Sequence, residues 1–129
     1  MRLYAVRKLI ESVRERRSRG DFILDPLLAK ILIKAKDRTE AWGGKLYFVY
    51  LPEFSRYNEA GHDHDLYRKK SKVIELVRGL NIPVIDIHQE VFAVHPDPLA
   101  LFALRLDGHY NAEGYSKAAK AIVLGVRNS

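Results

Sequence analysis

Apolar residues recur with a helical period in several parts of this chain and form short continuous runs in others. Residues 3–18 place Leu, Val and Ile at three- and four-residue spacing opposite Arg, Lys and Glu. This pattern predicts a basic amphipathic helix over residues 1–20. A second helix is predicted to begin at Asp25, which forms a good N-cap with Pro26 in the first turn, and to stop at Gly43.

The same period marks two helices later in the chain. One is predicted over residues 65–78, where Gly79 provides a C-terminal stop. The last begins after Asn111 as N-cap, with Glu113 in its first turn. Its apolar stripe, which we expect to be buried, comprises Ala112, Tyr115, Ala119, Ile122 and Val126.

Two short apolar runs, residues 46–51 and 81–86, are rich in β-forming residues and predict strands. The order helix, strand, helix, strand, helix indicates a single α/β domain over residues 1–129, with parallel strands and helices on the faces of the sheet. Two strands are few for such a sheet, because they leave open edges and enclose little core. We therefore expect an incomplete domain, whose missing strands belong to an N-terminal half or come from another chain, including a second copy of this one.

Composition narrows the possible chemistry. The chain has 129 residues, of which 47% are hydrophobic, and it has no cysteine. Thiol catalysis, disulfides and thiolate metal sites are thereby excluded. No wholly apolar run is longer than residues 46–51, and this run is far shorter than the roughly 20 residues that a membrane-spanning helix requires. Charged residues interrupt the N-terminus before an apolar signal-peptide core could form, so we expect no export signal in these residues.

The net charge of +6 is concentrated in the N-terminal third of the chain. Up to Arg38 there are eleven Lys and Arg against five Asp and Glu, and the remainder has eleven of each. Much of this excess falls near the end of the predicted basic helix, where cations face water and complement the helix dipole. No aromatic platform accompanies it, so we expect no nucleic-acid partner; a contact with phosphate or anionic lipid remains the alternative.

Asp107 and His109 are the candidate catalytic pair. They precede the last helix, on a loop that follows a Pro-rich stretch, and loops beyond the carboxyl ends of parallel strands are where α/β proteins build their sites. Imidazole exchanges protons near neutral pH, and a carboxylate on its other nitrogen fixes the tautomer. In an extended loop, residues two apart point the same way, so the two side chains could meet. The alternative is that both make only turn and capping hydrogen bonds.

The segment Asp107-Gly-His109-Tyr-Asn111-Ala-Glu-Gly114-Tyr resembles the closing block of SGNH (GDSL-like) hydrolases. More loosely, the two predicted strands resemble the late strands of that fold. The resemblance implies a flavodoxin-like fold with a three-layer parallel sheet, of which this chain would form the C-terminal part. It also implies that His109 is the catalytic base and Asp107 its carboxylate partner, acting on a small-molecule or carbohydrate ester without a cofactor or metal.

This sequence departs from the family in two ways. One residue, rather than the commoner two, separates Asp107 from His109. The family's Gly-Asp-Ser nucleophile block and the Gly and Asn of its oxyanion hole are not identifiable, and Gly20-Asp21-Phe22 matches only in letters. The same context is missing around Ser12, Ser18, Ser55, Ser71, Ser116 and Ser129. Acyl transfer needs a nucleophile, so we predict that the chain alone is inactive and that the serine belongs to a missing N-terminal half.

The other histidines carry weaker expectations. His62 and His64 have carboxylates between and after them, but a zinc site needs three or four converging ligands, so we expect a polar loop and no metal. His88 and His95 have no visible partner and are interpreted as surface or packing residues. Residues past the first strand could line a substrate cleft, namely Glu53, Arg56 and Tyr57.

Two hypotheses from different classes follow. The first is the C-terminal part of an SGNH-like ester hydrolase or acyltransferase that uses His109. The second is a non-catalytic interaction module that binds an anionic partner through the basic helix over residues 1–20. A Gly-Asp-Ser block joined to this chain would favour the enzyme.

Overall fold

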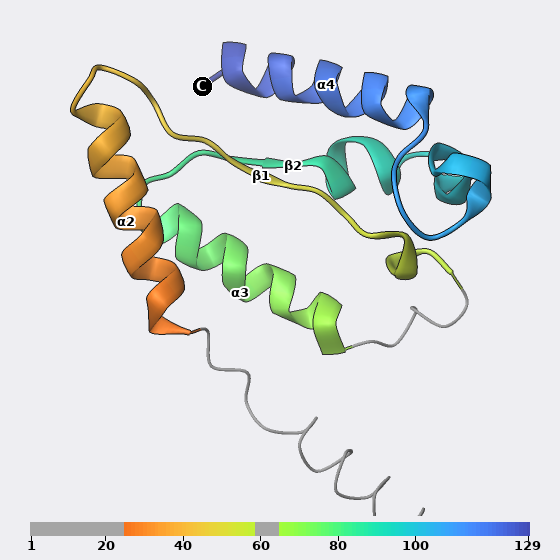
Figure 1. Ribbon diagram of the computed structural model, residues 1–129, viewed down its shortest axis with the longest axis horizontal. Coiled ribbons are helices and arrows are strands. Elements are labelled where there is room, and N and C mark those ends of the chain that lie inside the picture. The colour runs from red at the N-terminus through yellow and green to blue at the C-terminus, as the bar shows by residue number, and fades with distance from the viewer. Residues whose placement is uncertain (1–24, 59–64) are drawn as a thin grey trace, which may run out of the picture.

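The computed structural model describes residues 25–58 and 65–129. Its elements follow the order α2 (Pro26–Glu40), β1 (Phe48–Tyr50), η1 (Phe54–Arg56), α3 (Asp65–Gly79), β2 (Val84–Asp86), η3 (His88–Phe92), η4 (Pro98–Leu101), η5 (Ala103–Arg105) and α4 (Ala112–Arg127) (Figure 1). The predicted basic helix over residues 1–20 and the His62/His64 loop lie outside the described residues. No helix within the described ranges is long and apolar enough to span a membrane.

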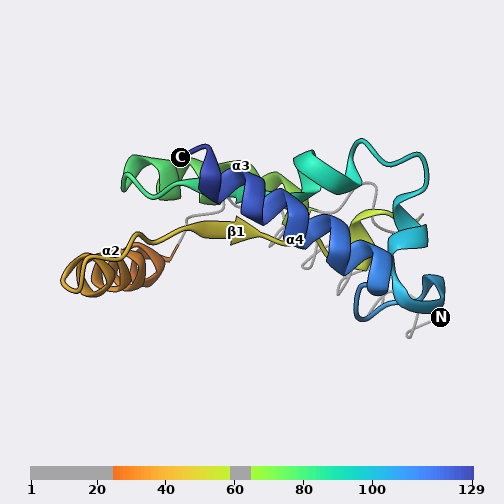
Figure 2. The same ribbon diagram turned by 90° about the horizontal axis from the view of Figure 1, so that it is seen from above.

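The two strands pair in parallel, as the sequence predicts. Phe48 lies opposite Val84 and Tyr50 opposite Asp86, and α3 forms the connection between the strands. Figure 1 shows α4 along one face of the pair and α3 along the other, and Figure 2 shows α4 crossing above the strands. The α/β class is confirmed. In the described part of the chain the sheet has only these two strands.

Both predicted helix caps that fall in the described residues are formed. The Asp25 carboxylate accepts a hydrogen bond from the Leu27 amide at 2.8 Å, with Pro26 at the first position of α2. The Asn111 side-chain oxygen accepts from the Gly114 amide at 2.9 Å, which satisfies a donor at the start of α4 that has no partner inside the helix. Local sequence thus sets where these helices begin.

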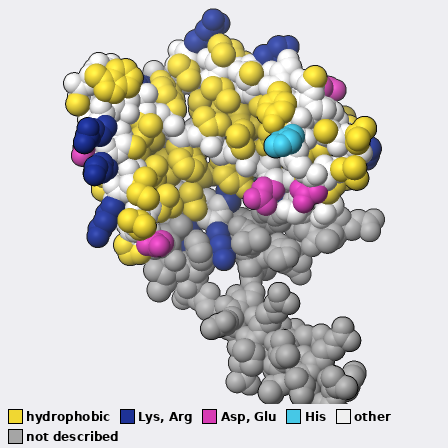
Figure 3. All heavy atoms as spheres, in the orientation of Figure 1, with side chains coloured by type: hydrophobic (Ala, Val, Ile, Leu, Met, Phe, Trp, Pro, Cys, Tyr) yellow, Lys and Arg dark blue, Asp and Glu magenta, His cyan; other side chains and the backbone are white. Residues whose placement is uncertain are grey.

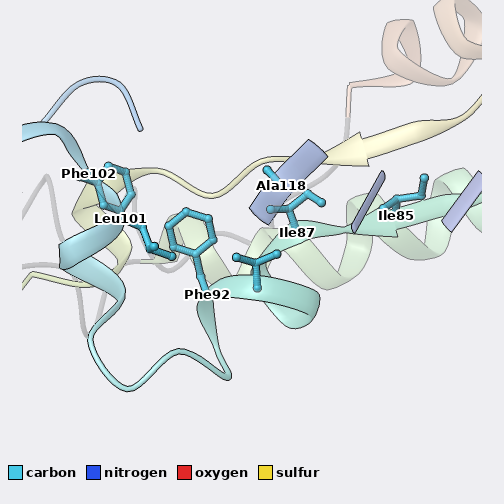
Figure 4. Packing of buried hydrophobic residues seen from close by; sticks show 7 residues of the cluster. Ile85, Ile87, Phe92, Leu101, Phe102 and Ala118 are labelled. Carbon is cyan, nitrogen blue, oxygen red and sulfur yellow. The ribbon is translucent and has the colours of Figure 1, made fainter. Parts of the chain in front are cut away.

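A cluster of buried hydrophobic side chains lies towards the carboxyl ends of the strands. Its side chains come from β2, η3, η4 and α4, and the largest of them are aromatic (Figure 4). The rings of Phe92 and Phe102 are 5.5 Å apart, and Phe54 meets Phe102 edge-on at 5.3 Å. Such pairs contribute beyond the area that they bury. The buried members are Ile85, Ile87, Val91, Phe92, Leu101, Phe102 and Ala118.

Helix α4 packs through its small residues. A Cβ atom on Gly114 would lie 2.4 Å from the Leu101 carbonyl oxygen, and one on Gly125 would lie 2.9 Å from the Ile85 side chain. These close approaches turn the face with Gly114, Ala118 and Gly125 towards the sheet. The predicted burial of the apolar stripe is therefore wrong for most of its members, which are exposed: Ala112, Tyr115, Ala119 and Val126.

Large apolar side chains remain exposed on both α2 and α4. Tyr115 is 53% exposed and Val126 43%, while Leu27 and Ile31 of α2 are each more than half exposed. Figure 3 shows hydrophobic side chains gathered over a broad part of one face of the molecule. Large exposed apolar patches are typical of interaction surfaces and of ligand-binding grooves.

The close contact at Gly114 gives a stability prediction. Gly114→Ala places its methyl group against the Leu101 backbone, so the free energy of unfolding should fall by about 1–3 kcal/mol. Gly79→Ala is the matched control, because a Cβ there meets nothing within 4 Å and should raise that free energy by about 0.4–1 kcal/mol. Urea unfolding followed by circular dichroism measures both. Equal effects of the two substitutions would show that α4 does not approach Leu101 this closely.

Candidate functional site

The loop that carries Asp107 and His109 is fixed beside the end of β1. Phe102 and Tyr110 form an isolated antiparallel bridge, in which the Ala103 amide donates to the His109 carbonyl at 3.0 Å. The Tyr110 hydroxyl donates to the carbonyl of Pro52, two residues after β1, at 2.5 Å. Burial raises the pKa of Tyr110 to about 12, so this hydroxyl keeps its proton. The backbone around His109 is therefore tied to the carboxyl end of β1.

The structure does not join the side chains of Asp107 and His109. Both are exposed, and within the described ranges no hydrogen bond or ion pair involves either side chain. The intervening Gly108 has φ +140°, so the backbone departs from the extended form in which residues two apart point the same way. The catalytic pairing stays a prediction.

A surface clip holds the turn before this loop. Leu104 and Arg105 both have positive φ, 53° and 55°, a conformation that disfavours residues with a side chain. The Arg105 guanidinium donates two hydrogen bonds, of 2.5 and 3.3 Å, to the Asp97 carboxylate. Those hydrogen bonds lower the pKa of Asp97. The carboxylate therefore stays charged, and the ion pair persists, at pH values below those at which a carboxyl group usually takes up a proton.

A second group of polar side chains lies at the carboxyl end of β2. The Lys70 ammonium of α3 is 2.5 Å from an Asp86 carboxylate oxygen, and these side chains are only 9% and 13% exposed. The other Asp86 oxygen accepts from the Gln89 amide at 3.3 Å. The Lys70 ammonium also lies 4.9 Å from the centre of the Tyr50 ring, within reach of a cation–π interaction.

Tyr57 and His88 form the second contact of this group. The Tyr57 hydroxyl lies 2.7 Å from His88 Nδ1, and the Tyr57 ring stacks on Phe92 at 5.4 Å. Burial raises the pKa of Tyr57 far above its usual range. Burial, followed by the positive charges of Arg56 and Lys70, lowers the pKa of His88 to about 4. At neutral pH the imidazole is uncharged and Tyr57 keeps its proton.

The sequence interpretation missed these partners. His88 and His95 do have contacts: His88 meets Tyr57, and His95 Nδ1 accepts from the Asp97 amide at 3.1 Å. The interpretation of His88 and His95 as surface or packing residues did not include these partners. A signal was present, because Asp86 ends a predicted strand and His88 comes just after it. Tyr57, however, is 31 residues from His88, and no local sequence pattern connects the two. The described residues contain no group of three or more side chains that could hold a metal ion.

A hollow in the surface lies elsewhere. It has a volume of about 740 Å³ and lies between η3 and the second half of α4, lined by Val91, Leu124, Lys117 and Lys120 among others. Neither Tyr57 nor any residue of the Asp107–His109 loop lines it. The polar side chains at the strand ends are the better candidate for chemistry, because parallel sheets present ligand sites there.

Comparison with protein-family models, curated proteins and solved structures finds no match to this chain. Function is therefore inferred from the residues and their geometry.

The low pKa of His88 predicts a pH-dependent stability. The unfolded chain takes up a proton near pH 6.5 and the folded chain only near 4, so the free energy of unfolding should fall as pH drops from 7 towards 4. Solvent screening around the partly exposed ring keeps the slope below the roughly 1.4 kcal/mol per pH unit that one proton allows. Urea titrations at several pH values measure this.

Two variants isolate the contribution of His88. His88→Gln should flatten the pH dependence, whereas His95→Gln should leave most of it in place. An NMR titration of the His88 ring should give a midpoint near 4. A midpoint at the ordinary value of 6.5 would contradict the burial of this imidazole.

Proposed function

We propose that this chain is the C-terminal part of an SGNH-like ester hydrolase, with His109 as general base and Asp107 as its carboxylate partner. The observation that carries the proposal is the attachment of the Asp107–His109 loop to the carboxyl end of β1 through the Tyr110–Pro52 hydrogen bond. Reactive side chains of open parallel sheets lie at this edge. The nucleophilic serine comes from a further part of the enzyme, and the substrate is a small-molecule or carbohydrate ester.

In the proposed reaction, His109 takes the hydroxyl proton of the serine as the serine oxygen attacks the ester carbonyl carbon. The resulting tetrahedral intermediate breaks the bond to the alcohol, which leaves with the proton from the imidazole. Water then attacks the acyl-enzyme by the same proton route and releases the acid. Asp107 accepts a hydrogen bond from the other ring nitrogen and stabilises the imidazolium.

Three features support completion of this site by another polypeptide segment. His109 is exposed, as a base must be if its serine arrives from outside the described residues. The described sheet has two strands of three residues each and open edges. The exposed apolar side chains of α2 and α4 offer surface that added strands and helices of a flavodoxin-like, three-layer sheet would cover.

The chain by itself should be inactive. The purified 129-residue chain is expected to hydrolyse p-nitrophenyl acetate no faster than a matched concentration of free imidazole, because its sequence contains no identifiable Gly-Asp-Ser nucleophile block. Turnover that is measurable above that background and lost in His109→Ala would contradict the missing nucleophile.

The complete enzyme should be detectable with a fluorophosphonate, which labels activated serines. The tagged chain is expressed in its native cells and purified under mild conditions after labelling. We expect a labelled serine either in the same polypeptide or in one that copurifies. His109→Ala should slow the labelling by about 10²–10⁴-fold, the usual contribution of a general base, without preventing assembly.

His95→Ala is the matched control, since His95 is bonded to the backbone of its own loop. It should leave the labelling rate unchanged. Labelling that is equally fast in the His109 variant, or the absence of any labelled serine, would refute the proposed function.

A further inference from the structure

The apolar stripe of α4 that the sequence predicts to be buried lies mostly in contact with solvent. Its members follow one another at alternating steps of three and four residues, the spacing by which one helix packs along a second helix. Four of them are exposed and Ile122 is half-buried; the exposed fraction of Tyr115 is 53% and that of Val126 is 43%. We call this set the α4 seam: Ala112, Tyr115, Ala119, Ile122 and Val126.

The seam is a different side of α4 from the one that packs inside the chain. Within the described residues α4 packs mainly on β2, η3 and η4, and Gly114 and Gly125 make close approaches to its neighbours. Because successive residues of an α-helix are about 100° apart, the seam is centred about 100° around the helix from Gly114, Ala118 and Gly125. A second helix could therefore cover the seam without disturbing the packing of α4 on the sheet.

The charged side chains of α4 lie away from the centre of the seam. Lys117 and Lys120 line the hollow between α4 and η3, which is on the opposite side of the helix. Glu113 belongs to the first turn of α4 and Arg127 to the last. The seam thus has an apolar centre and ends of opposite charge, a combination that is typical of the core and rim of protein interfaces.

The seam is complementary to itself. Ala119 lies at its centre, with Ala112 seven residues before it and Val126 seven residues after it. A twofold axis at Ala119 would make two copies of α4 antiparallel, with Ala112 beside the partner's Val126 and Tyr115 beside the partner's Ile122. Small and large side chains then meet along the whole seam. The methyl group of Ala119 lets the two helix axes come close where they cross.

Charge favours the antiparallel direction. Antiparallel pairing brings the first turn of one copy, which carries Glu113, beside the last turn of the other, which carries Arg127. It also sets the two helix dipoles in opposite directions. Parallel pairing would instead bring like charges and like helix ends together.

We propose that the α4 seam is a homodimer interface, on which a second copy of this chain packs its own seam antiparallel around a twofold axis at Ala119. The proposal does not depend on ester hydrolysis, because it needs neither His109 nor a serine. The exposed Leu27 and Ile31 of α2 and Leu124 of α4 stay outside this interface and remain available to further segments of the proposed enzyme. One helix pair is smaller than a standard protein interface, so we expect a dissociation constant of about 1–100 µM.

Sedimentation equilibrium of the full chain over concentrations of about 1–500 µM tests the dimer. We expect the average mass to rise from that of one chain to that of two as the concentration increases. Ala119→Glu places two like charges face to face at the axis and should weaken the association by about tenfold or more. Leu124→Glu is the matched control, because it adds the same charge at an exposed position of α4 outside the seam, and should change the dissociation constant by less than about threefold.

Two results of this experiment would overturn the proposal. A single-chain mass at every concentration would mean that another polypeptide, and not a second copy, is the partner of the seam. Equal weakening by Ala119→Glu and Leu124→Glu would place the contact between copies elsewhere on α4.

Disulfide cross-linking tests the register, and it applies even if Ala119→Glu does not fold. The chain has no cysteine of its own, so single substitutions introduce the only thiol. In Ala119→Cys the two thiols meet at the axis, and a covalent dimer should form on oxidation with glutathione disulfide. Val126→Cys alone should stay unlinked, because the partner's Ala112 lies beside it. A mixture of the Ala112→Cys and Val126→Cys chains should link one chain of each kind.

Leu124→Cys controls for links that form by random collision, since this side chain is also exposed on α4 but lies outside the seam. Its cross-linking should be much slower than that of Ala119→Cys. Equal rates for these two variants, or no link in the mixture of Ala112→Cys and Val126→Cys, would overturn the proposed interface. Rapid linking of Val126→Cys with itself would do the same, because it would indicate parallel helices.

Discussion

The rings of Phe92 and Phe102 lie 5.5 Å apart with almost no exposed surface, and the segments that carry Tyr57, His88 and His109 all pack against them. Tyr57 stacks on Phe92, His88 begins the helical turn that ends at Phe92, and Tyr110 contacts both rings. A pair of three-residue strands cannot organise these loops alone. The aromatic core, rather than the sheet, fixes the geometry of both candidate sites.

The local features of this fold could be predicted from sequence because neighbouring residues determine them. The caps at Asp25 and Asn111 and the parallel strand pair all agree with the prediction. Burial on α4 could not be predicted in the same way. Its periodic stripe identifies an apolar face, but the close approach at Gly114 and Gly125 decides which face meets the sheet. That choice depends on residues across the interface, which periodicity along one helix does not contain.

The two Asp-x-His segments show that local sequence also does not determine the partners of functional side chains. Asp86 and His88 have the spacing of Asp107 and His109, yet Asp86 pairs with Lys70 and His88 with Tyr57. The place of the second segment in the α/β order predicted that it lies near the carboxyl end of a strand, and the Tyr110 hydroxyl does reach Pro52 after β1. The partners of Asp86 and His88 come from α3 and from the residue that follows η1, far away in sequence, so a short motif alone does not define them.

The Arg105–Asp97 clip makes the order of the His109 loop depend partly on the solution. This ion pair helps to hold a turn in which two consecutive residues, Leu104 and Arg105, have left-handed backbone conformations. Both side chains of the pair are about half exposed. Dissolved ions weaken exposed pairs much more than they weaken buried contacts. Two contacts therefore hold the His109 loop. Packing of Tyr110 on the aromatic core does not depend on ionic strength, whereas the Arg105–Asp97 ion pair weakens as the salt concentration around the protein rises.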